Sequence, residues 1–347
     1  MIQSTVRKFL MKGISLIPQA VFSRVVPRDS FVFEYHLVAD EDLPHIQSLY
    51  SYKSRRAFID DLDFLEKEFD LLGYEDFIDR TTGRQKKGRP AALITFDDGL
   101  SECYQVVRPL LLERGIRAIF FLATDFIDNR ALFHRHAESL CIERLKEMAP
   151  NRQQEYYTQL NEQFESELSC FTEVQDFLRD IHRRDPARGL DTVGSMLGID
   201  FDEFLADHNP YLSRDQIVKM AEEGFTIGAH SLDHEDLKEL DAESIEQQIT
   251  GSCETVAEIT GQKPVPFAFP YGMTELNREL LAEIAKKHDS TVGVMFGTHG
   301  ILLEPPYLNR INADSPDGAL PGHSNIPQKV RRAYVRYPLS RLYRLLS

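Results

Sequence analysis

Short apolar runs alternate with amphipathic segments along much of the chain. The apolar runs predict buried strands over residues 31–38, 91–96, 118–122, 225–229, 265–269 and 291–295. The segments between them carry apolar residues at helical spacing and predict helices over residues 56–70, 103–114, 213–224, 241–261 and 274–288. Because strands and helices take turns in this way, the sequence predicts an α/β fold with a mostly parallel sheet, closed or nearly closed into a barrel.

The alternation stops between residues 126 and 210. This stretch is charged and rich in Gln, most clearly at 151–163, and it contains few β-branched residues, so it favours helices. We therefore predict a barrel over residues 29–328 that carries a helical insertion at about 126–210.

Both ends of the chain are basic. Residues 1–28 hold five Lys or Arg and no acid, and residues 329–347 hold six and no acid. Basic amphipathic segments of this kind can lie on anionic membranes, but two terminal helices packed on the barrel would show the same pattern. Gly13, Ser15 and Pro18 interrupt the first apolar stretch, so we expect no secretory signal, and no window is long and apolar enough for a transmembrane helix.

Composition narrows the class of protein. The 347 residues are 42% hydrophobic, which is enough core for one large barrel or two ordinary domains. A formal charge of −15 argues against nucleic acid as a partner. The four cysteines show no metal-binding or disulfide spacing and fit a reducing compartment. We therefore expect a cytoplasmic protein, with peripheral association at the inner face of an anionic membrane.

Two acids and two histidines follow predicted buried strands. Asp97 and Asp98 end the run 91–96, and His230 and His234 follow the run 225–229. The carboxyl ends of parallel strands are where α/β folds build their sites. A catalytic zinc-type site needs three protein ligands and an open position, and Asp98, His230 and His234 supply such a set. Asp97 is then the candidate for accepting a proton from water.

Each of these motifs also has a structural interpretation. The sequence Asp-Asp-Gly is more often a turn than a site, and two histidines four residues apart are common on exposed helices. The zinc-protease motif HExxH is not present, because Ser231 follows His230.

Taken together, the motifs resemble those of a known family. Residues 95–99 (Thr-Phe-Asp-Asp-Gly) and 230–234 (His-Ser-Leu-Asp-His) match, in order, the first two motifs of the polysaccharide deacetylase (NodB-homology) carbohydrate esterases. The resemblance covers roughly residues 30–125 and 210–312. It implies a distorted (β/α) barrel of the NodB-homology type with a helical insertion.

The resemblance also implies roles for the first two motifs. Asp97 corresponds to the general base of the family. Asp98, His230 and His234 correspond to the ligands of Zn²⁺ or another divalent transition metal.

The later motifs match in part. Residues 267–272 (Phe-Ala-Phe-Pro-Tyr-Gly) resemble the third motif, Arg-x-Pro-Tyr, but Ala268 stands near the position of the Arg that braces the catalytic Asp. Arg310 is the candidate to replace it. The resemblance implies that Pro270 and Tyr271 line the substrate site and that the Tyr271 N–H helps to hold the oxyanion.

The general acid of the family comes from a Leu-x-His motif. His323 follows a leucine by three residues instead of two, and His299 is an alternative; a surface histidine is the other interpretation of both. His36 follows Tyr35 as in several family members, so it lines the pocket or is a core histidine. The chain has no Trp, so any stacking on a sugar falls to Tyr or Phe, such as Tyr271.

These features predict a metal-dependent hydrolase that removes N-acetyl groups from an amino sugar in a polysaccharide or lipid-linked glycan. The expected partner is an N-acetylated sugar. Two alternatives remain: a glycan-binding or scaffold protein that keeps the barrel without the chemistry, and a metal-dependent amidase for a non-sugar substrate.

Overall fold

The computed structural model describes residues 30–84, 88–185, 188–298, 303–304, 306–314 and 325–333. The chain divides into two compact units. Unit 1 comprises residues 1–40, 52–127 and 212–347, and unit 2 comprises residues 41–51 and 128–211.

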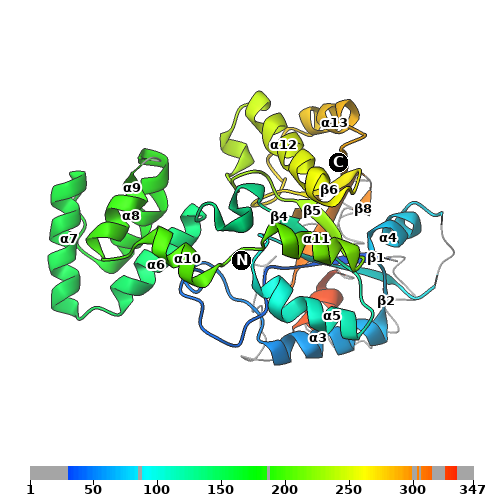
Figure 1. Ribbon diagram of the computed structural model, residues 1–347, viewed down its shortest axis with the longest axis horizontal. Helices are drawn as coiled ribbons and strands as arrows, with labels where there is room; N and C mark the ends of the chain where they lie inside the picture. The colour runs from blue at the N-terminus through cyan, green and yellow to red at the C-terminus, as the bar shows by residue number, and fades with distance from the viewer. Residues whose placement is uncertain are drawn as a thin grey trace, which may run out of the picture. The chain divides into compact units, whose positions relative to one another are not determined.

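Unit 1 contains a closed barrel of parallel strands. Figure 1 labels several of its strands, with helices around them. In order around the barrel, the strands are β1 (Ser30–Tyr35), β3 (Ala91–Phe96), β4 (Ala118–Leu122), β5 (Thr226–Ala229), β6 (Val265–Ala268), β7 (Val292–Thr298) and β9 (Tyr307–Asn312). Pairing of β9 with β1 closes the ring. Outside it, β2 (Asp70–Leu71) pairs with β3, and β8 (Leu303–Glu304) runs antiparallel to β9. The predicted (β/α) barrel is confirmed.

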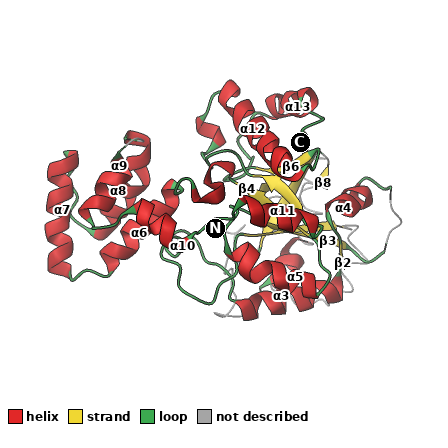
Figure 2. Ribbon diagram, viewed as in Figure 1, coloured by secondary structure: helices red, strands yellow, loops and turns green. Residues whose placement is uncertain are grey.

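Helices surround these strands (Figure 2). They are α3 (Arg55–Glu68), α4 (Tyr74–Thr81), α5 (Arg108–Glu113), α11 (Arg214–Glu222), α12 (Ala242–Thr260) and α13 (Arg278–Lys287). Side-chain caps fix where two of these helices begin: Ser213 and Gln216 form a capping box before α11, and Asp241 caps α12. Gly261 ends α12 in the left-handed conformation, at φ 72°.

The inside of the barrel is apolar toward the amino ends of the strands and polar toward their carboxyl ends. Val32, Leu93 and Leu308 belong to one buried apolar cluster. Two residues further along the same strands come Glu34, Thr95 and Arg310, all buried. Because successive residues on a strand face opposite sides, these polar side chains share the inner face with the apolar ones and lie one layer closer to the carboxyl ends.

Some element boundaries differ from prediction. Strand β1 ends at Tyr35 instead of continuing to 38, because the N–H of His36 donates to the Asp314 side chain. The predicted helix 103–114 begins with a π-helical turn, Cys103–Val107. Helix α13 begins after Asn277, whose side chain caps it, and not at Thr274. Strand β9 was not predicted, since polar residues interrupt its sequence.

Unit 2 is built from α6 (His134–Lys146), α7 (Pro150–Phe164), α8 (Phe171–Arg184), α9 (Gly189–Met196) and α10 (Phe201–His208). It has a hydrophobic core of its own, which includes Cys141, Leu145, Tyr156, Leu160, Val174 and Val193.

The ends of the chain lie largely outside the described residues, including the predicted basic segment 1–28. Residues 326–333 are helical, and Ile326 and Val330 are buried in the main core of unit 1. The expected tail boundary at 329 therefore falls inside this helix. In the part of the chain that the structure describes, no helix is long and apolar enough to cross a membrane.

Candidate active site

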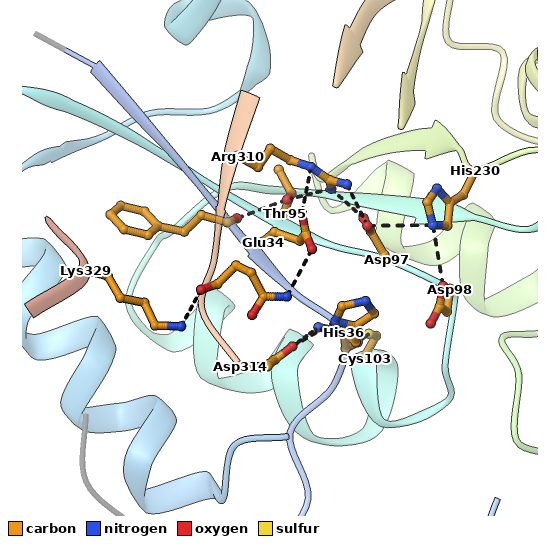
Figure 3. A network of polar contacts seen from close by, with 12 residues as sticks. Glu34, His36, Thr95, Asp97, Asp98, Cys103, His230, Arg310, Asp314 and Lys329 are labelled. Carbon is orange, nitrogen blue, oxygen red and sulfur yellow. Dashed lines mark hydrogen bonds and ion pairs between the residues drawn. The ribbon is translucent and has the colours of Figure 1, made fainter. Parts of the chain in front are cut away.

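Asp97 and Asp98 follow β3 at the carboxyl end of the barrel and are both buried. Neighbours on a strand would point to opposite faces, but Asp98 adopts a left-handed conformation with φ 72°. As a result both carboxylates reach the same histidine. The Nε2 atom of His230 lies 3.7 Å from Asp97 Oδ2 and 3.6 Å from Asp98 Oδ1 (Figure 3).

His230 directly follows β5 and is fixed by two contacts. Its backbone N–H donates to the carbonyl of Leu122 at 2.8 Å, and its Nδ1 lies 2.8 Å from the carbonyl oxygen of Ala268. A carbonyl only accepts, so Nδ1 carries the proton and Nε2 keeps its lone pair. That tautomer directs the basic nitrogen of His230 at the two carboxylates.

His234 reaches the same place from an irregular loop. Ser231 and His234 have φ values of 66° and 62°, and the Ser231 Oγ accepts from the His234 N–H at 3.0 Å. The Nε2 atom of His234 then lies 3.1 Å from Asp98 Oδ1. The alternative in which the histidine pair sits on an exposed helix is therefore wrong.

Two neighbouring segments anchor this loop. Gln248 of α12 accepts from the Leu232 N–H at 2.8 Å and donates to the Asp233 carboxylate at 2.9 Å. The N–H groups of Thr124 and Asp125, after β4, donate to the carbonyls of Ser231 and Leu232. The histidines are thus held from both sides, as supported metal ligands usually are.

Asp98, His230 and His234 fit a divalent metal. One ligand atom from each lies within 4.8 Å of the others, and all three residues are buried. Burial lowers the pKa of His230 to about 4. Burial raises the pKa of Asp98, but the charge and hydrogen bond of His234 outweigh it and bring that pKa well below its usual value. A neutral imidazole and an ionised carboxylate are the forms that bind Zn²⁺.

Arg310 of β9 holds Asp97 in a bidentate pair. Its two terminal nitrogens lie 2.6 Å and 2.7 Å from Asp97 Oδ1 and Oδ2, and one of them also donates to Thr95 Oγ1 at 3.2 Å. Arg310 is only 1% exposed. In the third motif, Ala268 of β6 cannot bind the Asp97 carboxylate as an arginine would. Arg310 makes that contact instead, from β9.

The electrostatics of Asp97 follow from this pair. Burial raises the pKa of Asp97, whereas Arg310, and after it His230, lower the pKa by more. The net pKa lies below the usual value, so Asp97 is ionised at neutral pH and can accept a proton.

Two further acids in this region were not predicted. Glu34 of β1 places Oε2 3.3 Å from Arg310 Nε. Asp314, just after β9, accepts from the His36 N–H at 2.8 Å and lies 2.9 Å from His36 Nδ1. Glu34 could have been recognised from the sequence, because it is a charged residue inside the predicted buried strand 31–38. We find no such local signal for Asp314.

His36 lies close to Asp97. One ring nitrogen of His36 and oxygens of Asp97 and Glu34 lie within 4.8 Å of one another. Burial by itself would lower the pKa of His36, but the hydrogen bond with Asp314, and then the charge of Asp98, raise it to about 10. His36 is therefore protonated at neutral pH.

Pro270 and Tyr271 form a turn after β6. The Gly272 N–H donates to the carbonyl of Phe269 at 3.2 Å, and Tyr271 has a φ of 54°. Tyr271 is 49% exposed, and the centroid of its ring lies 5.1 Å from that of His234. An exposed aromatic residue therefore lies beside the metal-ligand set. His323 and His299, the predicted candidates for the acid, lie outside the described residues.

Comparison with known proteins agrees with the barrel and the motifs. A family model described as polysaccharide deacetylase matches residues 84–165 and 195–293, which is more than half of the chain. A search of curated protein sequences with this chain found no match.

The solved structures that share the fold include the following three. IcaB from Ammonifex degensii has a TM-score of 0.54 at 17% identity, covering 88% of this chain and 97% of that one. A de-N-acetylase from Aggregatibacter actinomycetemcomitans has a TM-score of 0.53 at 15% identity, with 86% and 99% covered. The deacetylase PplD from Streptococcus pyogenes, in complex with acetate, has a TM-score of 0.53 at 14% identity, with 86% and 96% covered.

The barrel, the order of the motifs and the extent of the family match lead to one conclusion. This chain belongs to the polysaccharide deacetylase family, whose members hydrolyse N-acetyl amide bonds in sugars.

Proposed function

We propose that this protein is a metal-dependent de-N-acetylase of an amino sugar in a polysaccharide or lipid-linked glycan. The observation that carries the proposal is the position of Asp97, ionised and braced by Arg310, beside the set Asp98, His230 and His234. Acetate is the acid that such a reaction releases, and PplD was solved with acetate.

Asp98, His230 and His234 would hold the metal, which we propose to be Zn²⁺ or a similar divalent ion. Two imidazole nitrogens and one carboxylate oxygen are a common donor set for catalytic zinc. When bound, such an ion polarises a carbonyl group and increases the acidity of water.

The remaining groups would divide the proton transfers and the charge stabilisation. Asp97 accepts the proton of the attacking water, while Arg310 keeps both of its oxygens in place. The backbone N–H of Tyr271 would donate to the oxyanion of the tetrahedral intermediate, where one such donor contributes about 3 kcal/mol. His36, protonated and oriented by Asp314, donates a proton to the amine nitrogen that leaves. The Tyr271 ring offers a stacking surface to the sugar.

The test is metal analysis of the purified protein, combined with a screen for acetate release from N-acetylated sugars of different length. We expect close to one divalent ion per chain, turnover on at least one sugar, and loss of turnover after chelation that the same metal restores. Bound metal without turnover on any sugar would contradict the proposal and favour the scaffold alternative. Turnover on simple amides alone would favour the amidase.

We also propose that the protein acts at the cytoplasmic face of a membrane. Support comes from the two basic ends, which together hold eleven Lys or Arg and no acid, on a chain whose formal charge is −15. Cations near an anionic surface each contribute about 1 kcal/mol to binding.

A further inference from the structure

We infer that Glu34 is a positioning residue for Asp97 and acts through Arg310 without touching the substrate. The inference rests on the proposed function, because it assigns Glu34 to the same reaction. Figure 3 shows Arg310 among Glu34, Thr95 and Asp97.

The order of the strands explains why Arg310 needs such a partner. Strand β1 lies between β9, which carries Arg310, and β3, which ends before Asp97. Arg310 therefore reaches across β1 to meet Asp97. Glu34 lies on the strand that is crossed, in register with Thr95 on one side and with Asn312 on the other.

Contacts on several sides then fix the guanidinium. Its terminal nitrogens are occupied by Asp97, and its Nε edge faces Glu34 Oε2 at 3.3 Å. Its face lies over the Phe121 ring, 5.3 Å from the centroid. The Nε and Oε2 atoms are not aligned for a hydrogen bond, so Arg310 attracts Glu34 through its charge. Burial raises the pKa of Glu34, and the charge of Arg310 opposes that rise. A long, flexible side chain held by charges at two edges keeps one orientation.

Glu34 is itself held in place. The Asn312 side chain donates to Glu34 Oε1 at 3.2 Å, and the carbonyl of Asn312 accepts from Lys329 at 2.5 Å. The carboxylate of Glu34 is therefore fixed before substrate arrives, which is what a residue that positions another group requires.

The test is Glu34→Gln, which keeps the size of the side chain and removes its charge. We expect kcat to fall about 10- to 100-fold, with KM changed by less than about twofold and the metal content unchanged. The matched control is Asp61→Asn. Asp61 on α3 is equally buried and ion-paired with Lys53 at 3.1 Å, but it lies outside the barrel. We expect that variant to keep its kcat.

A double variant tests whether Glu34 acts through Arg310. If Glu34 acts through Arg310, then Glu34→Gln combined with Arg310→Gln loses no more kcat than Arg310→Gln alone. Multiplied losses, an unchanged kcat in Glu34→Gln, or an equal loss in Asp61→Asn would each overturn the inference.

A crystal structure of Glu34→Gln separates this inference from the proposed function. If the wild-type protein releases acetate from no sugar, the proposed function fails, but the structure still reports on Arg310. We expect at least one of the bonds to Asp97, now 2.6 and 2.7 Å, to lengthen beyond about 3.5 Å. Retention of both bonds would overturn the positioning role.

Discussion

Asp97 makes contact with Arg310 through both of its carboxylate oxygens, and this contact governs its chemistry. The pair keeps Asp97 ionised and fixes the direction of its remaining lone pairs, at the cost of some basicity. A carboxylate of lowered pKa is a weak base toward ordinary water. It is suited to water whose acidity a bound cation has already increased.

The adjacent acids Asp97 and Asp98 have different predicted roles, as proton acceptor and metal ligand. Mutation of the proton acceptor and mutation of a metal ligand should therefore have different effects. Asp97→Asn should lower the rate of acetate release by about 100-fold or more, because it removes the proton acceptor, and it should leave the metal bound. His230→Ala should lose the metal. Metal analysis alongside acetate assays separates the two effects; loss of metal in Asp97→Asn would mean that Asp97 is a ligand.

Arg310→Lys tests whether the bidentate geometry matters beyond the charge. Lysine keeps the charge, but it has a single donor nitrogen and cannot hold both oxygens of Asp97. We expect kcat to fall by about tenfold or more in a folded protein. Arg310→Met should instead lower the free energy of unfolding by about 3–5 kcal/mol, because it leaves two buried carboxylates facing each other. Equal activity of Arg310→Lys and wild type in steady-state assays would show that charge alone is enough.

Strand β5 places His230, and its close packing explains a glycine there. A Cβ at Gly228 would lie 2.3 Å from a ring carbon of Phe121 and 2.8 Å from the Pro266 carbonyl oxygen. We expect Gly228→Ala to lower the free energy of unfolding by about 1–3 kcal/mol. The control is Gly251→Ala on α12, where the nearest contact, Leu232, is an ordinary 3.5 Å. That change should raise stability by up to about 1 kcal/mol. Denaturant unfolding of both variants measures the contrast, and equal stability of the two would contradict the packing argument.

Helix α6 of unit 2 carries a buried acid, Glu138, paired with Arg135 at 2.6 Å and with Arg179 at 3.7 Å. Burial raises the pKa of Glu138 to about 6, and the two arginines oppose the shift only in part.

The sign of the pH effect follows from that shift. Between the unfolded pKa of 4.5 and the folded pKa of about 6, the folded state binds more protons, so stability falls as pH rises through this window. The loss is about 2 kcal/mol. The variant Glu138→Gln should not lose this stability. The free energy of unfolding of wild type and variant, measured by denaturant at pH 4.5 and pH 7, tests the difference. A loss of equal size in the variant would assign the effect to another group.

Several elements could be predicted because their signals are local. Strands β3 and β4 have the predicted bounds, since each is an uninterrupted apolar run. Strand β9 was missed because Asn309, Arg310 and Asn312 interrupt any such run. Asp97, which pairs with the terminal nitrogens of Arg310, lies 213 residues earlier in the chain. No short stretch of sequence therefore contains both residues.

The molecule as a whole is acidic with basic ends, which predicts salt-sensitive binding to anionic vesicles. Deleting residues 1–28 and 336–347 should abolish this binding, because it removes eight of the terminal cations and spares the buried helix 326–333. Co-sedimentation with phosphatidylserine vesicles at low and high salt measures the effect. Neutral phosphatidylcholine vesicles are the control, and equal binding to both lipids would contradict the prediction.

Short-range patterns were enough to predict the barrel and to single out Asp98, His230 and His234, which the structure brings together. The first follows from apolar periodicity, and the second from two compact motifs, each at the end of an apolar run. Short-range patterns could name Arg310 only as a candidate, and they gave no sign of Asp314 beside His36. Those pairings depend on β9 closing the ring against β1, which joins parts of the chain more than 270 residues apart. A buried charged side chain is stable only when an oppositely charged or hydrogen-bonding partner lies beside it. For Arg310 and His36, that partner comes into reach only when the barrel closes.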